Sequence, residues 1–123
     1  MARALIIEDN ASFRTMLRLA LTQLGHEVIE ARHGKEGLAL QRKTSVDFVI
    51  TDLLMPEMEG VETIMALKRC APQLKIIAIS GGGKVPAEDY LQIAAKVGAT
   101  CTLAKPFSAK ALAAAVATVL QPG

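Results

Sequence analysis

The stretch FVITDLLMPEMEG, residues 48–60, contains an apolar run that ends in a charged residue. The run FVIT, residues 48–51, is typical of a buried strand, and Asp52 follows it directly. Because burying an unpaired charge is costly, a carboxylate at this point needs a partner or a chemical task. Pro56 and Gly60 indicate a loop after the strand, with Gly60 introducing the next helix.

Similar short apolar runs recur along the chain and alternate with segments of helical spacing. The expected strands are residues 4–7, 28–31, 48–51, 75–79 and 101–104. The expected helices are residues 13–24, 35–43, 61–68, 90–98 and 108–120, with Ser108 as the N-cap of the last. This strict alternation predicts an α/β protein with a doubly wound, five-stranded parallel sheet that helices cover on both faces. In such sheets, functional groups collect beyond the carboxyl ends of the strands.

Composition limits the class of protein. At 123 residues, without a linker, repeat or low-complexity segment, the whole of 1–123 is expected to be one domain without an output domain. The net charge is +2 and basic residues run no longer than pairs, which argues against nucleic-acid binding. The chain has no run of the length that a membrane span needs and begins without a signal peptide, so we expect a soluble, cytoplasmic protein. Cys70 and Cys101 stand alone in apolar surroundings, which predicts two buried free thiols.

Polar residues follow four of the expected strands. Glu8 and Asp9 follow the first strand, Asp52 the third, Ser80 the fourth and Lys105 the fifth. Three crowded carboxylates repel one another, which favours proton uptake or a divalent cation, and oxygen ligands suit Mg²⁺. Glu8 then acts from the second shell by holding metal-bound water. Asp52 is the candidate nucleophile toward a phosphoryl group, with Lys105 neutralising the phosphoryl oxygens and Ser80 donating a hydrogen bond to one of them.

Four motifs carry a resemblance to a known family. IIEDN (6–10), DLLMPEMEG (52–60), IAISGGG (77–83) and LAKPF (103–107) occur in the order found in receiver domains of two-component response regulators. The chain resembles these domains over essentially its whole length, and in particular the stand-alone chemotaxis regulators. The resemblance implies a flavodoxin-like sheet with strand order 2-1-3-4-5.

The resemblance also implies a role for each matching residue. Asp52 is the phosphoacceptor, Asp9 a Mg²⁺ ligand, Leu54 a ligand through its backbone carbonyl, Glu8 the other acidic-pocket residue, Ser80 the switch hydroxyl and Lys105 the phosphate-pairing lysine. A cis peptide bond is implied between Lys105 and Pro106. One position departs from the family, because Thr102 stands where a Tyr or Phe usually couples the switch hydroxyl to the output surface. Tyr90 is an alternative source of that aromatic ring.

Three functions remain open from the sequence. The leading one is a signalling switch, not an enzyme, that takes a phosphoryl group from a histidine kinase or histidine phosphotransfer protein. It then changes its affinity for a downstream protein, through the face of residues 84–120, as a monomer or weak dimer. A phosphatase of the haloacid-dehalogenase type also phosphorylates an aspartate, but it needs an acid two residues later, where this chain has Leu54. A degenerate receiver acting as a constitutive interaction module is the third.

Overall fold

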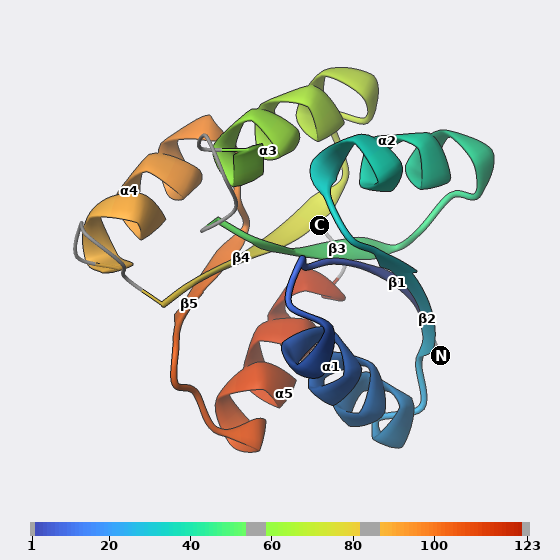
Figure 1. Ribbon diagram of the computed structural model, residues 1–123, viewed down its shortest axis with the longest axis vertical. Coiled ribbons are helices and arrows are strands. Elements are labelled where there is room, and N and C mark those ends of the chain that lie inside the picture. Colours follow the sequence, from blue (N-terminus) through green and yellow to red (C-terminus); the bar gives the residue numbers. More distant parts are fainter. Residues whose placement is uncertain (1, 54–58, 82–86, 122–123) are drawn as a thin grey trace.

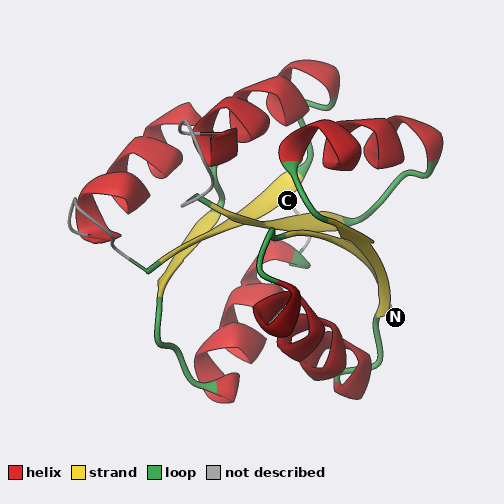
Figure 2. Cartoon of the chain, viewed as in Figure 1, coloured by secondary structure: helices red, strands yellow, loops and turns green. Residues whose placement is uncertain are grey.

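The computed structural model describes residues 2–53, 59–81 and 87–121, without the side chains of residues 59, 87, 88, 90 and 91. Strands and helices alternate along the chain (Figure 1; Figure 2). The strands are β1 (Arg3–Ile7), β2 (Glu27–Ala31), β3 (Phe48–Asp52), β4 (Lys75–Ser80) and β5 (Cys101–Ala104). The helices are α1 (Ala11–Gln23), α2 (Gly34–Lys43), α3 (Glu59–Cys70), α4 (Ala87–Val97) and α5 (Ala109–Val119). In the described part of the chain, no helix is long and apolar enough to cross a membrane.

The five strands form one parallel sheet in the order β2-β1-β3-β4-β5. Helices α1 and α5 cover one face, and α2, α3 and α4 cover the other (Figure 1). The fold class and strand order predicted from the sequence are therefore confirmed. The chain leaves β1 toward β2 on one side and continues through β3 on the other, so the strand order reverses between β1 and β3. Ligands of open α/β sheets bind beyond the strand ends at this point.

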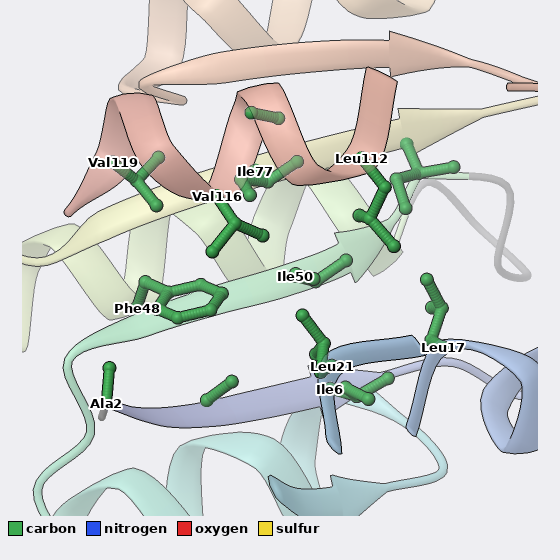
Figure 3. Close-up of a cluster of buried hydrophobic side chains, with 13 residues drawn as sticks. Ala2, Ile6, Leu17, Leu21, Phe48, Ile50, Ile77, Leu112, Val116 and Val119 are labelled. Carbon is green, nitrogen blue, oxygen red and sulfur yellow. The ribbon is translucent and has the colours of Figure 1, made fainter. Parts of the chain in front are cut away.

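Two apolar clusters, one on each face, hold the helices to the sheet. Successive strand residues point to opposite faces, so Ile6 and Ile50 join the α1 and α5 side while Leu5 and Val49 join the other (Figure 3). All residues of β3 are buried, in agreement with its continuous apolar sequence. The edge strand β5 alternates between partly buried and exposed residues. The strand with every residue buried is thus the one that ends in Asp52.

Polar caps and glycines set the ends of several helices. The Asn10 side chain accepts a hydrogen bond from the Phe13 N–H at 2.8 Å and begins α1, directly after Glu8 and Asp9. Ser108 accepts from the Ala111 N–H at 3.0 Å and caps α5, as predicted. Gly98 follows α4 with φ +124°, a backbone conformation that favours glycine.

Both cysteine thiols are free, but the prediction that both are buried is wrong. Cys70 is the last residue of α3 and is exposed, with its Sγ 3.8 Å from Nη2 of Arg42. Cys101 is partly buried on the edge strand β5, and burial raises the pKa of its thiol. The apolar residues beside Cys70 in the sequence do not decide its exposure, because the rotation of α3 against the sheet determines which residues point inward.

Candidate functional site

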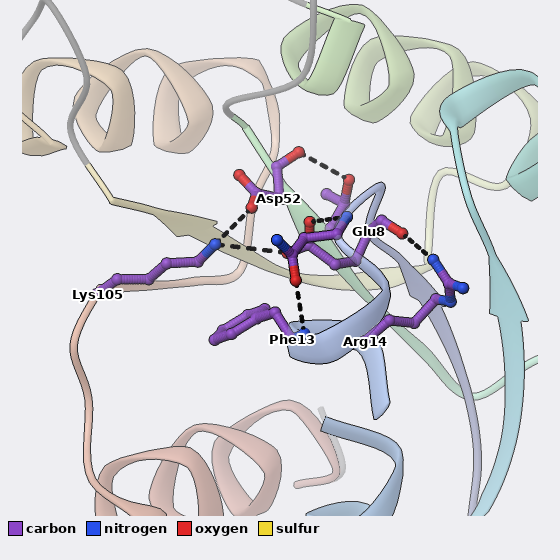
Figure 4. A network of polar contacts seen from close by, with 7 residues as sticks. Glu8, Phe13, Arg14, Asp52 and Lys105 are labelled. Atoms are coloured by element: carbon purple, nitrogen blue, oxygen red, sulfur yellow. Dashed lines mark hydrogen bonds and ion pairs between the residues drawn. The ribbon is translucent and has the colours of Figure 1, made fainter. Parts of the chain in front are cut away.

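Three of the buried polar residues that the structure describes lie at the carboxyl ends of strands. Glu8 follows β1, Asp52 ends β3 and Ser80 ends β4, and their relative exposures are 1%, 4% and 0%. Lys105 follows β5 and reaches toward the other strands from the edge of the sheet (Figure 4). The structure therefore brings together, beside the reversal of strand order, the groups that the sequence placed at separate strand ends.

The Lys105 ammonium joins the two buried carboxylates. Its Nζ donates to Oδ2 of Asp52 at 2.7 Å and lies 3.5 Å from Oε1 of Glu8 (Figure 4). The Lys105 backbone N–H donates to the Ser80 carbonyl at 2.8 Å, which attaches this residue to the end of β4. The peptide bond between Lys105 and Pro106 is cis. The lysine is thus fixed at both its backbone and its ammonium group.

The crowding of carboxyl groups changes the protonation of Glu8. Burial is the largest cause that raises its pKa, the hydrogen bond with Asp52 adds to this, and the pKa reaches about 8. The Asn10 N–H, which donates to Oε2 at 3.0 Å, opposes the rise only in part. The raised pKa favours a protonated Glu8 at neutral pH, and the 3.5 Å contact of Glu8 with Lys105 is longer than the 2.7 Å contact between Lys105 and Asp52. The ion pair proper is the one between Lys105 and Asp52.

Lys105 stays charged in this environment. Burial by itself lowers the pKa of the ammonium, but the hydrogen bond and charge of Asp52 outweigh it, and the contact with Glu8 acts in the same direction. The net effect is a raised pKa. The site thus holds a charged ammonium in contact with the carboxyl groups of Asp52 and Glu8, of which Glu8 has a raised pKa.

Glu8→Gln is expected to remove a pH dependence of stability in metal-free buffer. Below pH 4.5, Glu8 is neutral in both the folded and the unfolded chain and contributes no difference. Between pH 4.5 and about 8 the unfolded chain loses this proton while the folded protein keeps it, so the free energy of unfolding falls as pH rises. The variant has no such proton, and its advantage in Tm over the wild type should grow from pH 5 to pH 8. A difference in Tm that stays constant over this range would contradict the protonation of Glu8.

Arg14, which the sequence analysis did not assign to the site, and Gly60, which it named as a structural residue there, both contact the backbone around the site. Arg14 of α1 donates from Nη1 to the Glu8 carbonyl at 2.9 Å and contacts Glu30 of β2 at 3.3 Å (Figure 4). Gly60, expected to introduce a helix, lies in the first turn of α3 and packs against the backbone of Asp52 and Leu53. The sequence around these two residues does not reveal the contacts themselves, because each contact joins separate elements of the fold.

The donor atoms of the site suit Mg²⁺. Proteins commonly bind this ion through one or two carboxylates, with water and substrate phosphate oxygens completing the octahedron. Asp9, which is exposed, and Asp52 supply two carboxylates, and the hydrogen bond between Glu8 and Asp9 is one of the causes that raise the pKa of Glu8. Within residues 2–53, 59–81 and 87–121, no group of three or more His, Cys, Asp or Glu side chains is arranged to hold a metal ion. The predicted contribution of the Leu54 carbonyl lies outside the described residues.

The remaining candidate residues differ in exposure. Ser80 is fully buried at the end of β4, whereas Thr102 is exposed on β5 opposite Ala78. The Tyr90 side chain lies outside the described part of the chain. Position 102 therefore supplies no aromatic ring, and a role for Tyr90 in its place stays a prediction.

Comparison with known proteins places this chain in a family. The model of the response regulator receiver domain matches residues 4–117. The response regulator receiver protein Anae109_2439 of Anaeromyxobacter is 39% identical over 106 residues, which are 86% of this chain and 43% of that protein. The chemotaxis protein CheY of Thermotoga maritima is 36% identical over 106 residues, 85% of this chain and 86% of that protein.

A solved structure agrees with these sequence matches. The receiver domain protein of Clostridium thermocellum superposes with a TM-score of 0.89 at 30% identity, over 98% of this chain and 94% of that one. The sheet order, the acidic residues after β1 and β3 and the lysine after β5 all lie within the matched region. The chain belongs to the response regulator receiver domain family.

Proposed function

We propose that this protein is a phosphorylation-dependent switch that accepts a phosphoryl group on Asp52 from a phosphohistidine of a histidine kinase or histidine phosphotransfer protein. The observation that carries the proposal is the 2.7 Å contact between Lys105 Nζ and Asp52 Oδ2 at the carboxyl end of a fully buried strand. A carboxylate at the end of a buried strand, in contact with a fixed ammonium, is placed to attack phosphorus. The same ammonium then faces the oxygens that the phosphoryl group brings.

Each nearby residue has a distinct task in this transfer. An Asp52 oxygen forms a bond to phosphorus as the bond from phosphorus to the donor imidazole breaks, and the imidazole leaves with a proton. Lys105 pairs with the phosphoryl oxygens, and Ser80 donates a hydrogen bond to one of them. Asp9, Asp52 and the Leu54 carbonyl would hold Mg²⁺, with Glu8 holding its water, and the ion would supply neutralising charge beside the transferred group.

The output of the switch is a change in affinity for a downstream protein. When Asp52 is phosphorylated, Lys105 pairs with the phosphoryl group. The connection between β5 and α5, which contains Lys105, then shifts with the lysine. The face formed by residues 84–120 contains α4, β5 and α5. Because it includes Lys105, this face is favoured as the surface that binds a downstream partner. A phosphoryl group shifts the two states only by its difference in interaction energy between them.

The haloacid-dehalogenase chemistry lacks a residue that it requires. That reaction uses an acid two residues after the nucleophile for proton transfer, and the side chain of Leu54 has no transferable proton. A role that involves no catalytic turnover is therefore favoured. The degenerate-receiver alternative is disfavoured by the intact set of Glu8, Asp52 and Lys105 in contact with one another.

Incubation with acetyl phosphate and Mg²⁺ tests the proposal. We expect intact-mass measurement to show one labile phosphoryl group per chain, and its yield to collapse when EDTA removes the metal. Continuous release of inorganic phosphate at a high rate, without accumulation of the adduct, would instead indicate a phosphatase. A chain that takes up no phosphoryl group although it is folded would indicate the constitutive interaction module.

A further inference from the structure

The ring of Phe13 lies against the charged end of Lys105. Lys105 Nζ is 3.9 Å from the centroid of the Phe13 ring, well inside the ~6 Å range of a cation–π interaction. The two side chains come from α1 and from the residue after β5, and Figure 4 shows Phe13 below the Lys105 side chain. The ammonium thus has the Asp52 carboxylate as one partner and an aromatic face as another.

The backbone and ring of Phe13 are held by three contacts. The Phe13 N–H donates to Asn10 Oδ1 at 2.8 Å, which fixes the first turn of α1. The ring meets Phe107 edge to face, with centroids 5.9 Å apart and an interplanar angle of 85°. Both rings also pack against the buried cluster between the sheet and α5. Phe107 is only two residues after Lys105, so the same connection carries the lysine and the support of the ring.

This arrangement restricts a side chain that is otherwise mobile. A lysine has a flexible four-carbon stem, and its strongly hydrated ammonium readily turns toward water. Lys105 is 27% exposed and borders a groove of about 430 Å³, lined by Asn10, Ser12, Phe13, Met16 and Lys105. The negative face of the ring gives the ammonium a fixed partner on this exposed side.

We propose that Phe13 is a positioning residue for the phosphate-pairing lysine: its ring holds the Lys105 ammonium where the phosphoryl oxygens arrive. Phe13 takes no part in the bond changes and acts only through Lys105. The inference rests on the proposed phosphorylation of Asp52. It also names an aromatic partner for this site in a chain that has Thr102 at the usual aromatic position.

Two substitutions separate the ring's electrostatics from its bulk. Phe13→Leu keeps an apolar side chain but removes the aromatic face, and we expect phosphorylation by acetyl phosphate in Mg²⁺ to slow about fivefold. Phe13→Tyr keeps the face and should react at nearly the wild-type rate. Met16→Ala, on the same helix and lining the same groove, is the matched control and should leave the rate unchanged. Phe13→Met supplies a second apolar variant, and circular dichroism verifies that each protein is folded.

A double-mutant cycle tests whether Phe13 acts through Lys105. In a Lys105→Ala background, Phe13→Leu should cause no further loss of rate, because the group that the ring positions is gone. A fivefold loss that persists in that background would overturn the proposal, as would equal rates for Phe13→Leu and the wild type.

An NMR measurement keeps this inference distinct from the proposed function. In the unphosphorylated protein, the ring current of Phe13 should shift the Lys105 side-chain protons, in the wild type and in Phe13→Tyr but not in Phe13→Leu. Unshifted protons in the wild type would refute the contact itself. If the shift is present and the wild type takes up no phosphoryl group, the proposed function fails and the contact stands.

Discussion

Asp52→Asn is expected to abolish phosphorylation while the protein stays folded. The amide nearly matches the carboxylate in shape, but it is a poor nucleophile toward phosphorus and a poorer ligand for Mg²⁺. Asp52 raises the pKa of Glu8 through a hydrogen bond and its charge, so its removal lets Glu8 ionise more readily. Glu8 lies 3.5 Å from Lys105 and then becomes its counterion. We therefore expect the free energy of unfolding to change by about 1 kcal/mol or less.

Intact-mass measurement after incubation with acetyl phosphate and Mg²⁺ checks this result. Asp89→Asn is the matched control, because Asp89 is exposed on α4 and should be replaced without effect on the yield. Tm values for both variants show whether the fold is retained. A stable, stoichiometric phosphoryl adduct in Asp52→Asn would mean that another residue is the acceptor.

Gly60→Ala is expected to cause the largest loss of stability among single methyl additions at the site. A Cβ at this position would lie 2.5 Å from the Asp52 carbonyl oxygen and 2.5 Å from Leu53 Cα. These are backbone atoms, so the contact can be relieved only by moving α3 or the end of β3. Overpacking of this kind costs ~1–3 kcal/mol, and we expect a loss at the upper end, equivalent to a fall in Tm of roughly 10 °C.

The position of the clash also links stability to function. Any shift of the Asp52 backbone moves the carboxylate relative to Lys105, so the rate of phosphorylation should fall together with Tm. Helix propensity acts in the opposite direction, because alanine is favoured over glycine within a helix by ~1 kcal/mol. A lower Tm in Gly60→Ala would therefore show that the clash dominates.

Gly37→Ala provides a matched comparison for Gly60. Gly37 is likewise a buried glycine in a helix, but an added Cβ there would meet the outer carbons of the Ile7 side chain. A side chain can turn aside more easily than a backbone, so we expect a much smaller change in Tm than for Gly60→Ala. Equal losses in the two variants would contradict the argument from backbone contact.

The sequence by itself determined the fold class and the composition of the site. Apolar runs of strand length, separated by segments of helical period, predict the parallel sheet, because both signals are local and repeat along the chain. The predicted strands agree with the observed ones to within one residue at each end. Since parallel strands place all their carboxyl ends at one edge, reading the residue after each strand was enough to assemble Glu8, Asp9, Asp52, Ser80 and Lys105.

Only the tertiary structure decided how these groups affect one another. The proton on Glu8 depends on burial and on the distance to Asp52, and the ring of Phe13 meets Lys105 only because α1 packs beside the residues after β5. The closeness of Gly60 to the Asp52 carbonyl and the exposure of Cys70 likewise follow from how α3 sits on the sheet. Local pattern specifies which face of an element is apolar, but desolvation, charge coupling and steric contact are set by distances between residues far apart in the chain. Those distances exist only once the helices have packed.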